Sequence, residues 1–150
     1  MDEQSIRRLL DSCFLAKNVI ETMKELPKGF KPRHIHVVEA VYELARVQEE
    51  VRVSDISQYL NITTPSVTKL IQELEKMKAL KKDSQKEDKR VSLVCLTDYG
   101  LELQEKYVTN YHKEWADKLQ DVTQDEEDTV IRVIKRLSET MPGNILINKE

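Results

Sequence analysis

Short polar side chains and basic residues gather between positions 64 and 90, and they are the groups in this chain best suited to bind another molecule. Hydroxyl and amide groups exchange hydrogen bonds with the edges of DNA bases, whereas ammonium and guanidinium groups pair with phosphate. The chemistry that they favour is therefore recognition of nucleic acid. In the first half of the stretch these residues are Thr64, Ser66, Thr68, Lys69 and Gln72, and in the second half they are Lys86, Lys89 and Arg90.

Residues 64–76 have the periodicity of an amphipathic helix. Val67, Leu70, Ile71 and Leu74 recur at helical spacing, and polar side chains take most of the remaining positions. One face of this helix can be buried while the other stays free, which suits a helix presented end-first to a groove of DNA. An ordinary surface helix has the same pattern, so the flanking sequence has to decide between the two.

The sequence before this helix has the form of a helix-turn-helix. A short helix is expected from Ser54, an N-cap candidate, to Asn61, which can adopt the left-handed conformation that ends a helix. Thr63 or Thr64 can cap the following helix, and Pro65 suits its first turn. Two capped helices joined by a turn of a few residues make up this motif.

A basic hairpin is expected directly after the helix. Residues 79–83 and 91–96 can pair as strands, and residues 84–90 between them form a polar turn without an apolar anchor. Basic residues outnumber acidic ones by seven to three over positions 76–90. Behind a helix-turn-helix, such a hairpin is a wing that reaches phosphates or a minor groove. A solvated hairpin tip is the alternative.

Five further elements complete the predicted order. Helices are expected over residues 3–25 and 32–47, with a very short strand at 51–53. Thr97 can cap a long helix, and Thr123 with Glu126 forms a capping box that opens a last helix. The apolar stripe of the long helix is expected at Leu101, Tyr107, Val108, Tyr111, Trp115 and Leu119. Pro142 and Gly143 stop this last helix.

The first and last helices carry apolar stripes that a winged helix does not need, because it closes a small core by itself. We expect these stripes to bury against a second copy of the chain, and packing within one chain is the alternative. A symmetric dimer would hold two recognition helices about 34 Å apart and read a pseudo-palindrome. The expected interface residues are Ile6, Leu9, Leu10, Val130, Ile134, Leu137 and Met141, of which the last four have coiled-coil spacing.

Composition limits the class of protein. A chain of 150 residues with 39% hydrophobic content suits one domain with its own core, and 34% charged residues with three glycines favour long helices. The net charge of −3 argues against a protein that coats nucleic acid non-specifically. Charge is instead polarised, because residues 114–128 hold seven acidic residues and one lysine, opposite in sign to 76–90.

Other classes lack their sequence signals. Cys13 and Cys95 are far apart without a CxxC motif, which indicates neither a disulfide scaffold nor a zinc module. His34 and His36 lie on different faces of one helix and are too few for a metal site. We expect no cofactor, no catalytic activity and no membrane partner, since phosphate loops, nucleophile elbows, signal peptides and long apolar runs are missing from the sequence. A cytoplasmic protein is expected.

With these motifs in place, the chain resembles the MarR family of winged helix-turn-helix transcriptional regulators over nearly its whole length. Residues 62–75 are similar to the recognition-helix pattern of that family. Asp88, Lys89 and Arg90, followed by the strand and then Leu96, Thr97 and Gly100, are similar to its wing signature. Two positions depart from the pattern. Lys78 stands where many members have the glycine that closes the recognition helix, and Lys82 stands where arginine is common.

The resemblance implies a homodimer that binds double-stranded operator DNA through the face Thr64, Ser66, Thr68, Lys69 and Gln72 in the major groove. Arg90 would enter the minor groove, and Asp88 would position it or brace the wing. Family members also respond to small anions or phenolic compounds, or to oxidants through a cysteine. Cys13 followed by Phe14 resembles the placement in peroxide-sensing members, although a buried packing cysteine is the common alternative.

The sequence thus predicts a mainly α fold with a small β-hairpin wing, in which a winged helix-turn-helix is flanked by N- and C-terminal dimerisation helices. The expected divisions of this single domain are a DNA-binding lobe at 33–97, helical dimerisation regions at 1–26 and 98–142, and a tail at 143–150. The predicted function is sequence-specific DNA binding by a homodimeric transcriptional regulator, more often a repressor than an activator. The alternative is a winged-helix module that binds protein without specific DNA binding.

Overall fold

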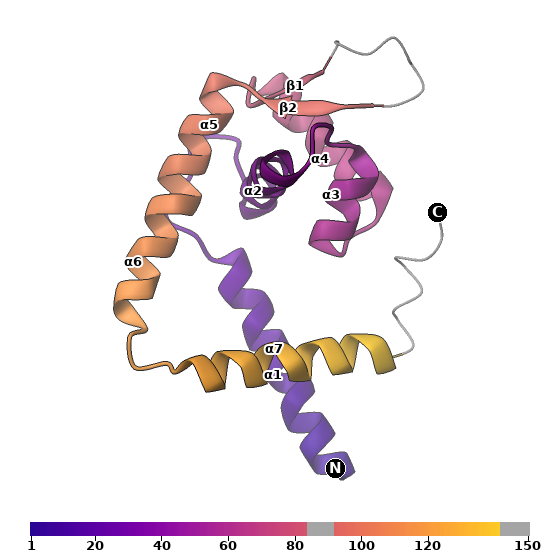
Figure 1. Cartoon of the computed structure of the whole chain (residues 1–150), viewed down its shortest axis with the longest axis vertical. Helices are drawn as coiled ribbons and strands as arrows, with labels where there is room; N and C mark the ends of the chain where they lie inside the picture. The colour runs from indigo at the N-terminus through magenta and orange to yellow at the C-terminus, as the bar shows by residue number, and fades with distance from the viewer. Residues whose placement is uncertain (84–91, 142–150) are drawn as a thin grey trace.

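The computed structural model describes residues 1–83 and 92–141. Helices dominate, and one short antiparallel hairpin pairs Leu80 with Leu96 and Lys82 with Val94, as expected for a winged helix-turn-helix (Figure 1). The elements in order are α1 (Glu3–Glu21), α2 (Pro32–Val47), α3 (Val53–Leu60), α4 (Thr64–Lys76), β1 (Leu80–Lys82), β2 (Val94–Leu96), α5 (Asp98–Gln104), the π-helix η1 (Glu105–Thr109), α6 (Asn110–Lys118) and α7 (Gln124–Thr140).

Local start and stop signals explain most helix ends. Pro32 occupies the first turn of α2, and the Thr63 side chain caps α4 by accepting from the Ser66 backbone N–H at 3.4 Å. Asn61 is left-handed with φ of 55°, as predicted. Lys78 is left-handed too, with φ of 63°. The chain therefore keeps at this position the conformation expected for the glycine of many MarR-family members, and a residue with a side chain destabilises that conformation by about 1 kcal/mol.

Two predicted helix boundaries and one predicted strand were wrong. The first helix ends at Glu21 rather than near residue 25. The cap of α3 is Arg52 rather than Ser54, because the Asp55 carboxylate accepts from the Arg52 N–H at 2.9 Å and brings Val53 and Ser54 into the helix. Residues 51–53 therefore form no strand, and only an isolated bridge joins Arg52 to Leu93.

The core surrounds α2, which lies at the centre of the lobe formed by α3, α4, α5 and the hairpin (Figure 1). Six residues of α2 are buried, including Ile35, Val38 and Val41. Val67 and Leu74 of α4 face this helix and are fully buried. Burying a side chain of this size contributes about 1.5–3 kcal/mol, so the inner face of α4 holds that helix firmly on α2.

The segments α5, η1 and α6 run on as one continuous rod that leaves the lobe (Figure 1). The sequence prediction placed Leu101 on the apolar stripe of this rod, but Leu101 is 46% exposed and Leu103 is only 3% exposed. The reason is the close approach of Gly100 to the backbone of Ala79 and to Leu96 of β2, which turns Gly100, Leu103 and Gln104 toward the core. A turn of π-helix holds about one residue more than a turn of α-helix. η1 therefore shifts the helical register of the residues that follow it in the rod.

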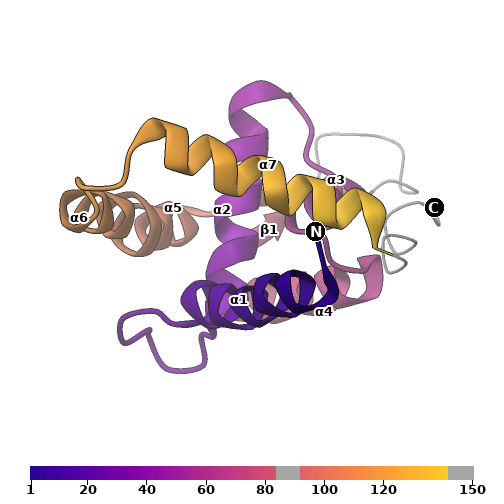
Figure 2. The same ribbon diagram turned by 90° about the horizontal axis from the view of Figure 1, so that it is seen from below.

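Neither α1 nor α7 contains a buried residue. The two helices overlap in Figure 1, but the view from below separates them (Figure 2). Large apolar side chains stay exposed on both, with Phe14 of α1 at 71% and Val130 of α7 at 61%. Polar contacts join the end of α1 to the rest: Lys24 pairs with Glu114 at 2.5 Å, and the Tyr111 hydroxyl donates to the Thr22 carbonyl at 3.3 Å.

A tight joint connects the end of α4 to the start of α5. The Thr97 hydroxyl donates to the Lys78 carbonyl at 2.6 Å and accepts from the Gly100 N–H at 3.1 Å, while the Thr97 N–H donates to the Ala79 carbonyl at 3.1 Å. A Cβ on Gly100 would lie 2.2 Å from the oxygen of Ala79. The absence of a side chain at residue 100 is therefore a condition for this joint.

We predict that Gly100→Ala lowers the free energy of unfolding by about 1–3 kcal/mol, because the backbone at Ala79 has to move. Chemical denaturation measures this difference. Glu102→Ala, at an exposed position of the same helix, is the matched control and should stay within about 0.5 kcal/mol of wild type. Equal stability of Gly100→Ala and wild type would contradict the close approach.

Candidate nucleic-acid interface

The outer face of α4 is polar and open to solvent. Val67, Leu70, Ile71 and Leu74 are buried on the inner face, so the helix can present only its other side. Four of the predicted contact residues share that outer side and are exposed, namely Ser66, Thr68, Lys69 and Gln72. Two hydroxyls, one ammonium and one amide are thus held on a single rigid helix.

Thr64 is placed differently from these four residues. It is half-buried, and its hydroxyl lies 3.5 Å from the Ser57 hydroxyl of α3. Ser57 in turn donates to the carbonyl of Ile62 at 2.5 Å, which closes the turn between the two helices. The structure therefore gives Thr64 a contact within the helix-turn-helix in addition to its position at the start of α4.

The cap of α4 also orients Ser66. The Thr63 hydroxyl lies 2.9 Å from the Ser66 hydroxyl and accepts from the Ser66 N–H. Ser66 is exposed, so its oxygen is oriented by the cap while it remains available to a ligand. The first turn of α4 consequently has a defined pattern of donors and acceptors.

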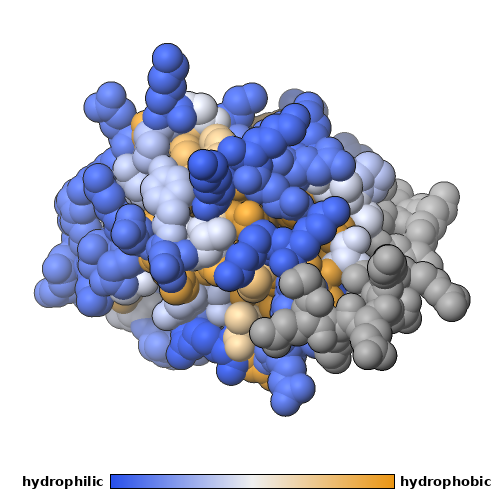
Figure 3. Space-filling view, turned by 90° about the horizontal axis from the view of Figure 1, so that it is seen from above, coloured by the Kyte–Doolittle hydropathy of each residue, from blue (hydrophilic) through white to orange (hydrophobic). Residues whose placement is uncertain are grey.

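Basic side chains surround the C-terminal end of α4. Lys76, Lys78, Lys81 and Lys82 are all exposed, the last two on β1. The face of the molecule on the hairpin side is largely hydrophilic, with a narrow apolar strip between polar side chains (Figure 3). The predicted wing residues Lys86, Asp88, Lys89 and Arg90 lie outside the described residues.

One polar contact at this site was not predicted from the sequence. His34 of α2 is buried at 1% exposure, and its Nε2 lies 2.5 Å from the Glu73 carboxylate of α4. This hydrogen bond, with smaller contributions from the charges of Lys69 and Lys31, holds the pKa of Glu73 below its usual value. The position of His34 three residues after the N-cap is the one sequence signal for a bonded histidine, and nothing in the sequence indicates Glu73 as its partner.

The residues predicted for a dimer interface lie on α1 and α7 without being buried. Leu10, Val130 and Ile134 are exposed, whereas Ile6, Leu9, Leu137 and Met141 are partly covered. Cys13 also lies on α1 and is a half-buried free thiol. Their roles in dimerisation and redox sensing stay predictions.

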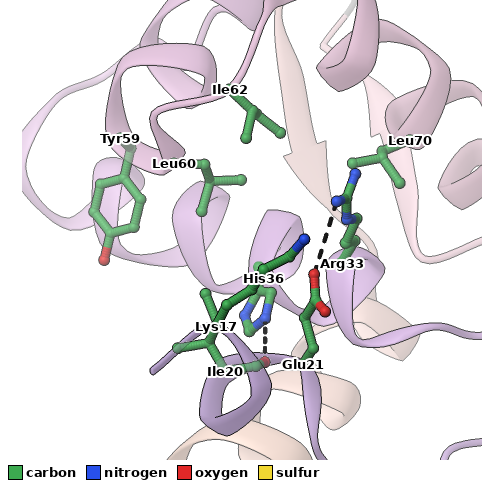
Figure 4. A pocket seen from close by; sticks show the side chains of 9 residues that line it. All are labelled: Lys17, Ile20, Glu21, Arg33, His36, Tyr59, Leu60, Ile62 and Leu70. Carbon is green, nitrogen blue, oxygen red and sulfur yellow. Dashed lines mark hydrogen bonds and ion pairs between the residues drawn. The ribbon is translucent and has the colours of Figure 1, made fainter. Parts of the chain in front are cut away.

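An open pocket of about 390 Å³ lies between α1 and the lobe, and the sequence did not predict it (Figure 4). The apolar side chains of Ile20, Leu60, Ile62 and Leu70 form part of its wall. Two polar contacts cross it: Arg33 pairs with Glu21 at 3.8 Å, and His36 Nε2 donates to the Ile20 carbonyl at 2.7 Å. Lys17 adds a second positive charge.

Comparison with known proteins fits this architecture. Residues 32–86 match the family model described as the N-terminal DNA-binding domain of iron-dependent repressors, which is less than half of the chain. No curated protein matches the chain. Across residues 1–83 and 92–141 no group of three or more His, Cys, Asp or Glu side chains could hold a metal ion.

Solved structures extend the likeness to both ends of the chain. A MarR/EmrR family transcriptional regulator from Acinetobacter sp. ADP1 superposes with a TM-score of 0.72 at 19% identity, covering 92% of this chain and 96% of that one. The chain has the MarR-family fold. The resemblance inferred from the recognition-helix and wing patterns is therefore confirmed at the level of the fold.

Two further structures with the MarR fold are similar to this chain. FabT from Streptococcus pneumoniae, solved in complex with DNA, has a TM-score of 0.65 at 22% identity, with 92% of this chain and 96% of that one covered. BpsR from Bordetella bronchiseptica, whose DNA binding is regulated by 6-hydroxynicotinic acid, has a TM-score of 0.67 at 19% identity, with 89% and 98% covered. Among the described residues of this MarR-fold chain, no helix is both long and apolar enough to cross a membrane.

Proposed function

We propose that this protein is a homodimeric, sequence-specific DNA-binding transcriptional regulator that acts in the cytoplasm as a repressor and has no catalytic role. The observation that carries the proposal is the exposed polar face of α4, fixed on a fold that FabT shares in a complex with DNA. Ser66, Thr68, Lys69 and Gln72 are the side chains placed to meet a major groove.

The chemistry of this face supports direct reading of bases. The amide of Gln72 can pair with the two edge atoms of adenine, and Lys69 can bind guanine or a phosphate. Hydroxyls of Ser66 and Thr68 suit several base edges. Lys76, Lys78, Lys81 and Lys82 would contact phosphates on either side of the groove. In this proposal Arg90, braced by Asp88 and accompanied by Lys86 and Lys89, enters the adjoining minor groove.

The dimer proposal follows from α1 and α7, which contain no buried residue within one chain. On α1, Leu10 and Phe14 lie on one side of the helix and Leu15 and Val19 on another, and all four are exposed. A helix with apolar residues on more than one side is normally buried from several directions. A second copy that contributes its own α1 and α7 would cover both sides. We therefore propose residues 1–26 and 98–142 as the dimerisation region and residues 33–97 as the DNA-binding lobe.

The pocket beneath the lobe is the proposed site for a small-molecule effector. Its volume is in the range of ligand sites, and it combines an apolar wall with the positive groups of Arg33 and Lys17. Such a lining suits a small aromatic anion. Because the pocket is bounded by α1 on one side and by α3 and α4 on the other, a ligand there would change how the lobe sits on the dimerisation helices.

The DNA proposal predicts a two-fold symmetric site when the protein selects from random duplexes. On that site, Lys69→Ala should weaken binding about tenfold and lower the slope of log K against log salt by about one, since one cation is lost. Arg90→Ala should weaken binding as well. Lys113→Ala, at an exposed position of α6, removes the same charge far from α4 and should leave both quantities unchanged. Salt-insensitive association, or wild-type binding by Arg90→Ala, would favour a protein-binding module.

The dimer proposal predicts that a charge in the α7 stripe separates the chains. Ile134→Glu should elute as a monomer in size exclusion with light scattering and should lose operator affinity, because one chain then binds one half-site. Thr129→Glu adds the same charge on another side of α7, where the residue is exposed, and should remain a dimer. If the Ile134→Glu variant remained a dimer, the apolar stripe of α7 would be excluded as part of the dimer interface.

The effector proposal predicts that benzoate, used as a probe, raises the melting temperature and releases the operator. Arg33→Gln should weaken benzoate binding about tenfold, since a charge-assisted hydrogen bond contributes about 1.5–3 kcal/mol. Arg46→Gln is the control, because Arg46 of α2 pairs with Glu43 and does not line the pocket. Equal benzoate affinity in the two variants would remove Arg33 from the site.

A further inference from the structure

His34 is a buried histidine whose two ring nitrogens both have partners. Its Nδ1 accepts from the Lys31 backbone N–H at 2.9 Å, so that nitrogen carries no proton. The proton is then on Nε2, which donates to Glu73 at 2.5 Å. The Phe30 and His34 rings pack in a T-shaped arrangement with centroids 6.0 Å apart, and Phe30 packs against Tyr99 of α5 in the same way. The orientation of this donor is therefore fixed from three sides.

Glu73 occupies a sensitive position on α4. It follows Lys69 by four residues, the spacing at which an ammonium and a carboxylate can pair on a helix surface. Its side chain is 36% exposed, so only part of it is covered by the protein. A glutamate of ordinary pKa is already ionised at neutral pH, and the hydrogen bond from His34 lowers the pKa of Glu73 further. A negative charge that was free to move here would neutralise Lys69 and repel phosphate.

We propose that His34 is a positioning residue for DNA binding, which holds the Glu73 carboxylate against α2 and so leaves the Lys69 ammonium available to DNA. The inference rests on the proposed function, since it concerns the affinity of the α4 face for an operator. His34 touches no DNA in this arrangement. It acts through Glu73, and its effect is on the net charge that α4 presents.

A purely structural role for His34 makes a different prediction. If the histidine only stabilised the packing of α2 on α4, its loss would weaken DNA binding whatever the charge at residue 73. If it restrains Glu73, neutralising that carboxylate must restore what the loss of His34 removes. The salt dependence of binding separates the two, because it counts cations that reach phosphate and is insensitive to the folded fraction.

The experiment measures affinity and salt slope on the operator selected by the wild type, with His34→Leu, Glu73→Gln and the double variant. Leucine keeps most of the buried volume but donates no hydrogen bond. His34→Leu should bind about tenfold more weakly with a slope lower by about one, and the double variant should regain both. Glu73→Gln alone should stay within about threefold of wild type with an unchanged slope, because its amide oxygen still accepts from Nε2. These magnitudes follow from one cation gained or lost at the interface.

Two controls make the result specific. Glu75→Gln removes a carboxylate from another side of α4 and should not rescue His34→Leu. His34→Gln retains a donor and an acceptor, and should bind DNA like the wild type. If His34→Leu does not fold, Glu73→Gln still decides, since a steeper slope and tighter binding by this variant would show that the carboxylate already faces DNA.

Failure of this inference differs from failure of the proposed function. A wild-type slope in His34→Leu, or equal weakness of His34→Leu and the double variant, would overturn the positioning role. If the wild-type protein selects no DNA at all, the proposed function fails.

Discussion

The burial of one face of α4 against α2 is the constraint on which the rest of the molecule depends. Val67 and Leu74 are fully buried against the central helix, and their loss of solvent contact contributes several kcal/mol. Because a helix is rigid over thirteen residues, fixing its inner face also fixes the direction of every outer side chain. The polar face does not contribute to this packing, so its residue types can vary with the ligand without loss of the fold.

Local signals made much of this arrangement predictable. Asn61, Thr63 and Pro65 act within a few residues of their own positions, so the turn between α3 and α4 could be derived from the sequence. Lys78 adopts a left-handed conformation at the position where many MarR-family members have glycine. The pairing of residues 79–83 with residues 91–96 was predicted as well, and the structure forms it between Leu80–Lys82 and Val94–Leu96.

Contacts between distant residues were beyond such reasoning. The link from His34 to Glu73 joins positions 39 residues apart, and neither residue type indicates the other. Thr64 looked like its neighbours on α4, but the packing of α3 half-buried it beside Ser57. The face of α5 was wrongly predicted because a glycine, which carries no hydrophobic signal, takes the position closest to the backbone of Ala79. Each miss reflects tertiary packing that overrides a local pattern.

The π-helix η1 has a consequence for how proteins of this shape can diverge. Such a turn accommodates one residue beyond the α-helical repeat, and removing a residue there would rotate the following helix by about 100°. α6 and α7 lie after this point, whereas α2, α3, α4 and the hairpin lie before it. A single insertion or deletion within residues 105–109 would therefore re-aim the helices that we propose to pair two chains, and it would leave the side chains that we propose to face DNA untouched. Half-site spacing and base preference could then change independently in evolution.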